Sequence, residues 1–113
     1  PTVRENENVS AVLLKITQSR AGAAVVVDAR GRLCGIFTDG DLRRHLEKDP
    51  QLPQRRIGEV MTRRPLTVRK DRLAAEALRL LEERKIDEVP VVDAAGKPVG
   101  LLDVQDLLRA QVV

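Results

Sequence analysis

The chain has 113 residues, 42% of them hydrophobic and 33% charged, which is enough for a packed core with a charged surface. Its 20 basic and 17 acidic residues leave a net charge of +3, a mild excess that does not indicate a nucleic-acid-binding protein. Phe37 is the only aromatic residue, so the ring stacking that holds single-stranded nucleic acid is missing as well. The sequence has no apolar run of about 18 residues and no signal-peptide pattern. We therefore expect a cytoplasmic protein that does not enter a membrane.

Two single residues add to this picture. Cys34 is the sole cysteine and cannot form an internal disulfide, and its apolar surroundings favour a buried, inert thiol. Pro1 stands where a complete chain would begin with Met, which suggests that the sequence is a piece of a longer protein.

The first predicted elements are a short extended segment over residues 1–3 and a helix capped by Asn6 or Asn8. One face of this helix is apolar, because hydrophobic side chains recur at positions i, i+3, i+4 and i+7. These side chains are Val9, Val12, Leu13 and Ile16. The helix ends at Ala21 and Gly22, and the valine-rich run over 23–27 then predicts a strand that is buried on both faces.

A tight turn is predicted over residues 28–31, with Gly31 where a positive φ is easiest, and residues 33–37 form the returning strand. A helix follows, and we expect Leu42 and Leu46 to point from it into the core. Residues 49–54 contain two prolines and few apolar side chains, so this segment is interpreted as the linker between two halves.

The second half repeats the first. An extended segment over 65–68 corresponds to 1–3, Asp71 is the expected N-cap of a helix, and the turn at 93–96 matches the turn at 28–31 with an offset of 65 residues. The apolar face of the second long helix is formed by Leu73, Ala74, Ala77, Leu78, Leu80 and Leu81. A strand over 99–102 and a helix over 103–110 complete the repeat.

The chain is therefore two β-α-β-β-α units, a fold of the α+β class with α/β-like units. Each unit is too small to bury its sheet alone, so we expect the two to pack with pseudo-twofold symmetry and to leave a cleft between them.

The most informative stretch runs from Gly35 to Arg44 and returns in altered form at 100–109. Thr38 and Asp41 have the spacing of a capping box, in which a hydroxyl accepts from backbone amides and an acid three residues later reaches back. A helix start of this kind also favours an anion such as phosphate. Plain helix capping explains the same spacing. In the second copy Asp103 takes the cap position and Asp106 the acid position.

These patterns resemble a pair of CBS domains, also called a Bateman module. The resemblance rests on segments 57–68 and 87–100 and on both turn-helix segments, and it covers nearly the whole chain. It implies tandem CBS domains over residues 1–52 and 53–113. The first copy lacks the lead-in that residues 57–62 supply for the second, which implies a truncated N-terminus.

A closer resemblance, over segments 23–49, 74–87 and 106–113, is to the C-terminal part of arabinose 5-phosphate isomerases. These enzymes supply a precursor of Kdo, a sugar of bacterial lipopolysaccharide, and carry a sugar isomerase (SIS) domain before the CBS pair. No stretch of this chain offers a catalytic site for aldose–ketose isomerisation, and no metal or required cofactor is expected. His45, the only histidine, is expected to be a surface or cleft residue without catalytic duty.

The CBS resemblance also implies which residues bind a ligand. In that family the threonine of the turn commonly meets phosphate and the aspartate three residues later binds ribose hydroxyls, which points to Thr38 and Asp41. In the second half Asp106 matches the ribose aspartate, but Asp103 would repel phosphate, so the first site is favoured. The remaining candidates wall the base pocket or contact the anion: Thr2, Ala23, Ala24, Arg44, Thr67, Val89 and Pro90.

Arginine supports an anionic ligand weakly, since paired arginines can bind phosphate in a bidentate manner. The arginines concerned are Arg43, Arg44, Arg55, Arg56, Arg63 and Arg64, and a solvated basic face explains them equally well. We interpret the chain as a regulatory homodimer, associating through its CBS helices, that binds a nucleotide or a nucleotide sugar such as CMP-Kdo. The alternatives are a structural dimerisation module with empty clefts, and the CBS pair of another protein.

Overall fold

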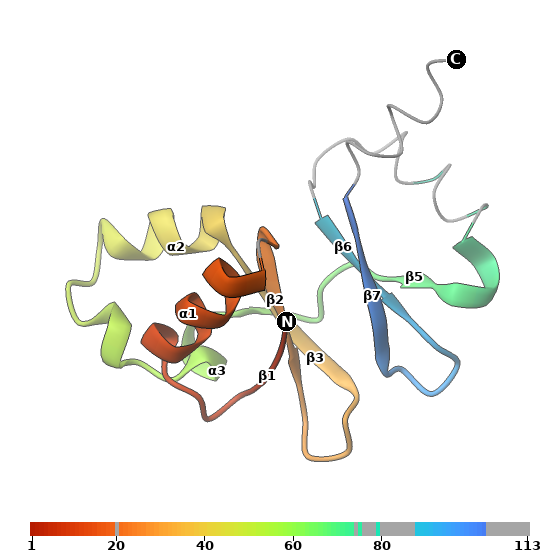
Figure 1. Cartoon of the computed structure of the whole chain (residues 1–113), viewed down its shortest axis with the longest axis horizontal. Helices are drawn as coiled ribbons and strands as arrows, with labels where there is room; N and C mark the ends of the chain where they lie inside the picture. The colour runs from red at the N-terminus through yellow and green to blue at the C-terminus, as the bar shows by residue number, and fades with distance from the viewer. Residues whose placement is uncertain (20, 74, 76–78, 80–87, 104–113) are drawn as a thin grey trace. The chain divides into compact units, whose positions relative to one another are not determined.

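The computed structural model describes residues 1–19, 21–73, 75, 79 and 88–103 (Figure 1). The chain divides into two units, Pro1–Pro65 and Leu66–Val113, and each is described by itself. The predicted apolar face of the second long helix lies largely outside the described residues, as does the last predicted helix.

The first unit contains a four-stranded sheet with the order β1-β2-β3-β4. Its strands are β1 (Thr2–Arg4), β2 (Ala23–Val27), β3 (Leu33–Thr38) and β4 (Thr62–Arg63). The pair β1–β2 is parallel, whereas β2–β3 and β3–β4 are antiparallel. All five residues of β2 are buried, which confirms the strand predicted from the valine-rich run.

Helix α1 (Val9–Ser19) packs on this sheet through the predicted apolar stripe. Val9, Val12 and Ile16 are buried in a cluster with strand residues, and Leu13 packs against the cluster. Burying each of these side chains contributes roughly 1.5–3 kcal/mol relative to leaving it exposed. The helix begins directly after Asn8, whose carbonyl accepts from Val12 N at 3.1 Å.

One expectation about the core of the first unit was wrong, and the predicted linker is itself packed. Helix α2 (Asp39–Leu46) directs Leu42 toward the core, but the side chain of Leu46 is 47% exposed at the end of the helix. The predicted linker at 49–54 forms the 3-10 helix η1 (Leu52–Gln54) and buries Leu52 completely. Proline at the start of a helical turn costs no hydrogen bond, so the prolines allow this compact structure.

The segment that follows η1 also belongs to the first unit. Helix α3 (Ile57–Val60) places Ile57 in the core, and Ile57 N donates to Glu7 O at 2.7 Å. Strand β4 then pairs with β3, with Gly35 opposite Arg63. Residues assigned by resemblance to the second CBS domain therefore complete the first sheet. The domain limits 1–52 and 53–113 remain a prediction.

The second unit repeats the β1-β2-β3 arrangement. Its strands are β5 (Val68–Arg69), β6 (Glu88–Val92) and β7 (Pro98–Asp103), with β5 parallel to β6 and β6 antiparallel to β7. Asp71 lies inside the 3-10 helix η2 (Lys70–Arg72), and its carboxylate pairs with Arg69 Nη2 at 3.0 Å. The helix that Asp71 was predicted to cap lies largely outside the described residues, so this N-cap remains a prediction.

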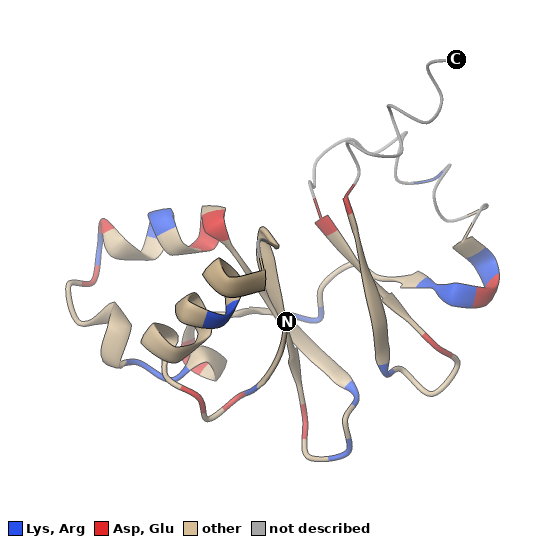
Figure 2. Cartoon of the chain, in the orientation of Figure 1, with Lys and Arg blue, Asp and Glu red and all other residues tan. Residues whose placement is uncertain are grey.

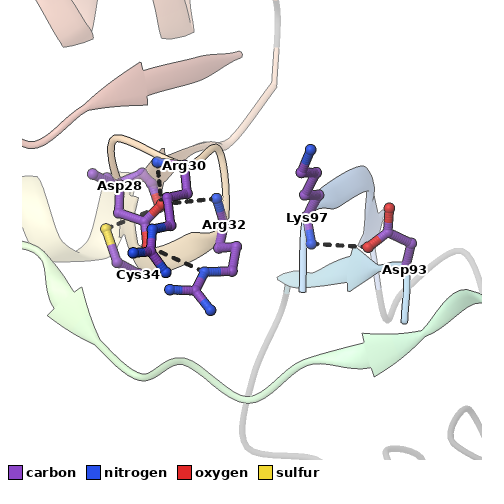
Figure 3. Close-up of polar contacts among 7 residues, drawn as sticks. Asp28, Arg30, Arg32, Cys34, Asp93 and Lys97 are labelled. Carbon is purple, nitrogen blue, oxygen red and sulfur yellow. Dashed lines mark hydrogen bonds and ion pairs between the residues drawn. The ribbon is translucent and has the colours of Figure 1, made fainter. Parts of the chain in front are cut away.

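The two hairpins have the same geometry (Figure 3). Asp28 Oδ1 accepts from Arg30 N at 2.9 Å and Arg32 N at 3.0 Å. Asp93 Oδ1 accepts from Ala95 N and Lys97 N at the same two distances. Each turn has a glycine with φ near 80°, which confirms the predicted use of Gly31 and its counterpart Gly96. The repeat in sequence is thus a repeat in structure.

Candidate functional site

The first turn of α2 contains the predicted capping box. Thr38 has an extended backbone, and its Oγ1 accepts from Asp41 N at 3.1 Å. In return, Asp41 Oδ2 accepts from Thr38 N at 2.9 Å. This reciprocal pair satisfies one amide of the first helical turn and the amide of the capping residue, and the positive end of the helix dipole lies at this turn.

Asp41 is the one charged residue that is buried among the described residues, with an exposed fraction of 5%. Its second oxygen, Oδ1, accepts from Arg44 Nη2, three residues further along the helix. Both oxygens of the carboxylate therefore have partners within the chain. Arg44 itself is 68% exposed along its side chain, so the buried acid is paired with a guanidinium that faces water.

The guanidinium of Arg44 folds back over the first turn of α2. A methyl group placed on Gly40 would lie 3.4 Å from Arg44 Nη1 and 3.6 Å from Thr38 Oγ1. Arg44 therefore lies against the same helix start to which the CBS resemblance assigns the phosphate.

Other predicted residues of the first half lie at the same edge of the sheet. Ala23 is fully buried and directly opposite Thr38, and Asp39 N donates to Gly22 O at 3.1 Å, which ties the start of α2 to the start of β2. Thr2 is exposed and begins β1, the other neighbour of β2. Ala24 instead lies in the hydrophobic core, opposite Phe37, where it serves packing.

The predicted residues of the second half are arranged on equivalent strands. Thr67 is half-buried directly before β5, and Val89 and Pro90 are buried in β6. Asp103 ends β7 and is exposed. Asp106 lies outside the described residues.

The two halves differ in chemistry at their matching positions. Ala23 faces Thr38 in the first sheet, whereas the residues facing each other at the same register in the second sheet are Glu88 and Asp103. Side chains at directly opposed positions are close neighbours. A small residue beside a hydroxyl leaves room for phosphate, but two carboxylates repel it.

Two contacts were not foreseen from the sequence. The ring of His45 is stacked on the buried Phe37, with the ring centres 6.5 Å apart and the planes inclined by 25°. His45 is half-buried. The ion pair of Arg44 and Asp41 has the i, i+3 spacing of a helix-surface pair, and that spacing was the available signal for it.

Two more of the six arginine residues considered for an anionic ligand are paired with acids. Arg55 pairs with Asp49 at 3.0 Å, and Arg63 pairs with Glu5 at 3.2 Å. Figure 2 shows basic and acidic residues interspersed along the first unit. These pairs favour the solvated-face interpretation for Arg55 and Arg63.

Within the described residues, no three His, Cys, Asp or Glu side chains are grouped in a way that would hold a metal ion. None of the described helices combines the length and apolar character needed to cross a bilayer.

Comparison with known proteins identifies the family. The CBS domain model matches residues 1–48 and 57–113. The arabinose 5-phosphate isomerase KdsD of Pseudomonas aeruginosa is 46% identical over all 113 residues, and this chain spans 35% of the length of that enzyme.

Solved structures agree with this assignment. CBSX2 in complex with AMP superposes with a TM-score of 0.77 and 31% identity, covering 97% of this chain and 85% of CBSX2. The CBS domain pair of MJ0100, in complex with 5′-methylthioadenosine and S-adenosyl-L-methionine, superposes with a TM-score of 0.81 and 26% identity, covering 96% of this chain and 88% of its own. The repeated hairpins, the α+β fold and these matches together show that the chain belongs to the CBS domain family and is a pair of such domains.

Proposed function

We propose that this CBS pair is the regulatory part of an arabinose 5-phosphate isomerase and binds a nucleotide or nucleotide sugar in its first half. The observation that carries the proposal is the start of α2, where Thr38, the buried Asp41 and the basic Arg44 meet at one edge of the sheet. A hydroxyl and the positive end of a helix dipole suit phosphate, and a buried carboxylate suits ribose hydroxyls.

The isomerase assignment draws on the 46% identity to KdsD over the whole chain. In the proposed parent protein an N-terminal SIS domain performs the aldose–ketose isomerisation in the cytoplasm, and the CBS pair regulates it allosterically as part of a homodimer. CMP-Kdo, a product further along lipopolysaccharide precursor synthesis, is the proposed effector. Regulation requires that this effector bind one conformation of the protein more tightly than another.

A thermal-shift screen of the chain with AMP, ATP, CMP, CMP-Kdo and arabinose 5-phosphate tests the binding proposal, because a ligand of the native state raises the Tm. A rise with CMP-Kdo that exceeds the rise with CMP supports the nucleotide sugar. Assay of a full-length isomerase carrying this pair, with and without the best ligand, then tests regulation.

The alternative is a structural dimerisation module without a ligand. Glu88 and Asp103 occupy opposed positions on neighbouring strands, and their two carboxylates favour this alternative for the second half alone. Absence of any Tm rise, together with a dimer in sedimentation, would support it for the whole chain. Regulation of a full-length protein by a ligand unrelated to sugar nucleotides would instead indicate the CBS pair of another protein.

A further inference from the structure

The carboxylate of Asp41 already has partners before any ligand binds. Its Oδ2 is held by the capping bond from Thr38 N, and its Oδ1 is held by Arg44. Only 7% of the Asp41 side chain is exposed, so a ribose hydroxyl has little room to approach the carboxylate beside the guanidinium. A ribose hydroxyl that reaches Oδ1 therefore competes with Arg44 for the small exposed part of the carboxylate.

Arg44 is able to move because most of its side chain faces water. Ion pairs with an exposed partner are weak, and among the described residues Asp41 is the ion-pair partner of this guanidinium. It lies close to Gly40, in the first turn of the helix, whose start favours an anion. A phosphate bound there would offer the guanidinium a stronger, bidentate partner than the carboxylate that it leaves.

We propose that Arg44 is a specificity-determining residue that selects ligands carrying a phosphate next to the ribose. In the unliganded protein it covers Asp41 and excludes uncharged nucleosides. A nucleotide phosphate draws the guanidinium to itself and thereby frees Asp41 for the ribose hydroxyls. This inference rests on the proposed nucleotide site and names the ligand class that the site prefers.

The competing explanation is that Arg44 only stabilises α2 through its i, i+3 ion pair. A structural role would change the affinity for nucleosides and nucleotides in the same direction. The proposed role changes them in different directions, because removal of the guanidinium uncovers Asp41 but takes away a phosphate ligand.

The experiment is calorimetric titration of the wild-type chain and of Arg44→Ala with two matched pairs, adenosine with AMP and cytidine with CMP. Arg44→Ala is expected to weaken nucleotide binding by about tenfold to a hundredfold. It is expected to leave nucleoside binding unchanged or to tighten it. The ratio of nucleoside to nucleotide Kd should therefore fall toward 1, and Arg44→Lys should restore part of it because lysine keeps the charge.

Arg43→Ala is the matched control, since Arg43 is the neighbouring exposed arginine of α2 and should leave the ratio unchanged. Thermal unfolding of each variant confirms that it is folded. An equal loss of affinity for both members of a pair, or no change in either, overturns the role of Arg44 while leaving the site in place. Failure of the wild-type chain to bind AMP, CMP or any ligand of the thermal-shift screen overturns the site itself.

Discussion

Met61 lies directly over Gly35, so that a β carbon added at Gly35 would be 2.3 Å from Met61 Sδ. This contact holds the segment after α3 against the third strand of the first sheet, where β4 pairs with β3. Position 35 is a glycine because Met61 fills the space that a side chain would occupy. Backbone conformation is not the reason, since the φ angle of Gly35 is not positive.

We predict that Gly35→Ala lowers the free energy of unfolding by about 1–3 kcal/mol, the usual cost of overfilling a packed core. Gly100→Ala is the matched control, because Gly100 is the counterpart of Gly35 in the second repeat and the nearest atom to its added carbon, Val91 Cβ, is 4.0 Å away. Urea denaturation measures both. Equal effects of the two substitutions would show that Met61 is not the cause.

Asp41→Asn should affect both stability and binding. Loss of the charged cap acceptor lowers the free energy of unfolding by about 1 kcal/mol. Loss of the charged acceptor for ribose hydroxyls weakens nucleotide binding by about tenfold to a hundredfold. Asp39→Asn, at an exposed acid of the same helical turn, is the control. Lower stability with unchanged affinity would leave Asp41 with a capping role only.

The hairpin aspartate Asp28 should make stability depend on pH. The hydrogen bond from the Arg32 amide, with a further one from Arg30, lowers the pKa of Asp28 below its ordinary value of about 3.9. A lowered pKa in the folded state stabilises the protein above the ordinary value, and this contribution is lost as the pH falls through the folded-state pKa. The difference between the urea midpoints at pH 7 and pH 3 should therefore be smaller for Asp28→Asn than for wild type. An unchanged difference would contradict this account.

Binding should occur with one nucleotide per chain. The second half presents Glu88 opposite Asp103 where the first half presents Ala23 opposite Thr38. Calorimetric stoichiometry near 1 is the expected result, and Asp106→Asn should not alter it. The double variant Glu88→Ala, Asp103→Thr copies the first half and should add weak binding at the second. A stoichiometry of 2 in wild type would refute the distinction between the halves.

Cys34 should react slowly with thiol reagents. Burial raises the pKa of the thiol, nearby Glu5 and Asp28 raise it further, and Sγ lies 3.4 Å from Val26 O (Figure 3). Because the thiolate is the reactive form, alkylation at pH 8 should be slower than for a free cysteine peptide. Denaturation in urea should bring the rate to that of the peptide, and equal rates without urea would be the contrary result.

Local signals predicted the elements that depend on local physics. The valine run gave β2 with its bounds, the i, i+3, i+4 spacing gave the buried face of α1, and the Thr38–Asp41 spacing gave the capping box. Each of these depends on neighbours within a few residues, and the repeat of 65 residues confirmed the hairpin by showing it twice.

Tertiary packing decided the features that were missed. Leu52 is an isolated apolar residue between prolines, and its burial depends on α1, a distant element. Leu46 follows Leu42 at helical spacing, but it is the last residue of α2 and stays exposed. The stacking of His45 on Phe37 likewise joins a helix to a strand. The candidate site was located from the family resemblance, and the pairing of Arg44 with Asp41 came from the structure.

Because β4 pairs with β3, the first sheet extends beyond the end of the first sequence repeat. A recombination or truncation made after residue 52 would keep the first repeat intact yet leave β3 with an unpaired edge and remove Ile57 and Met61 from the core. An exposed strand edge of this kind promotes aggregation. A design that separates the two halves should therefore cut no earlier than Pro65, and a chimera joined at the repeat boundary should be insoluble.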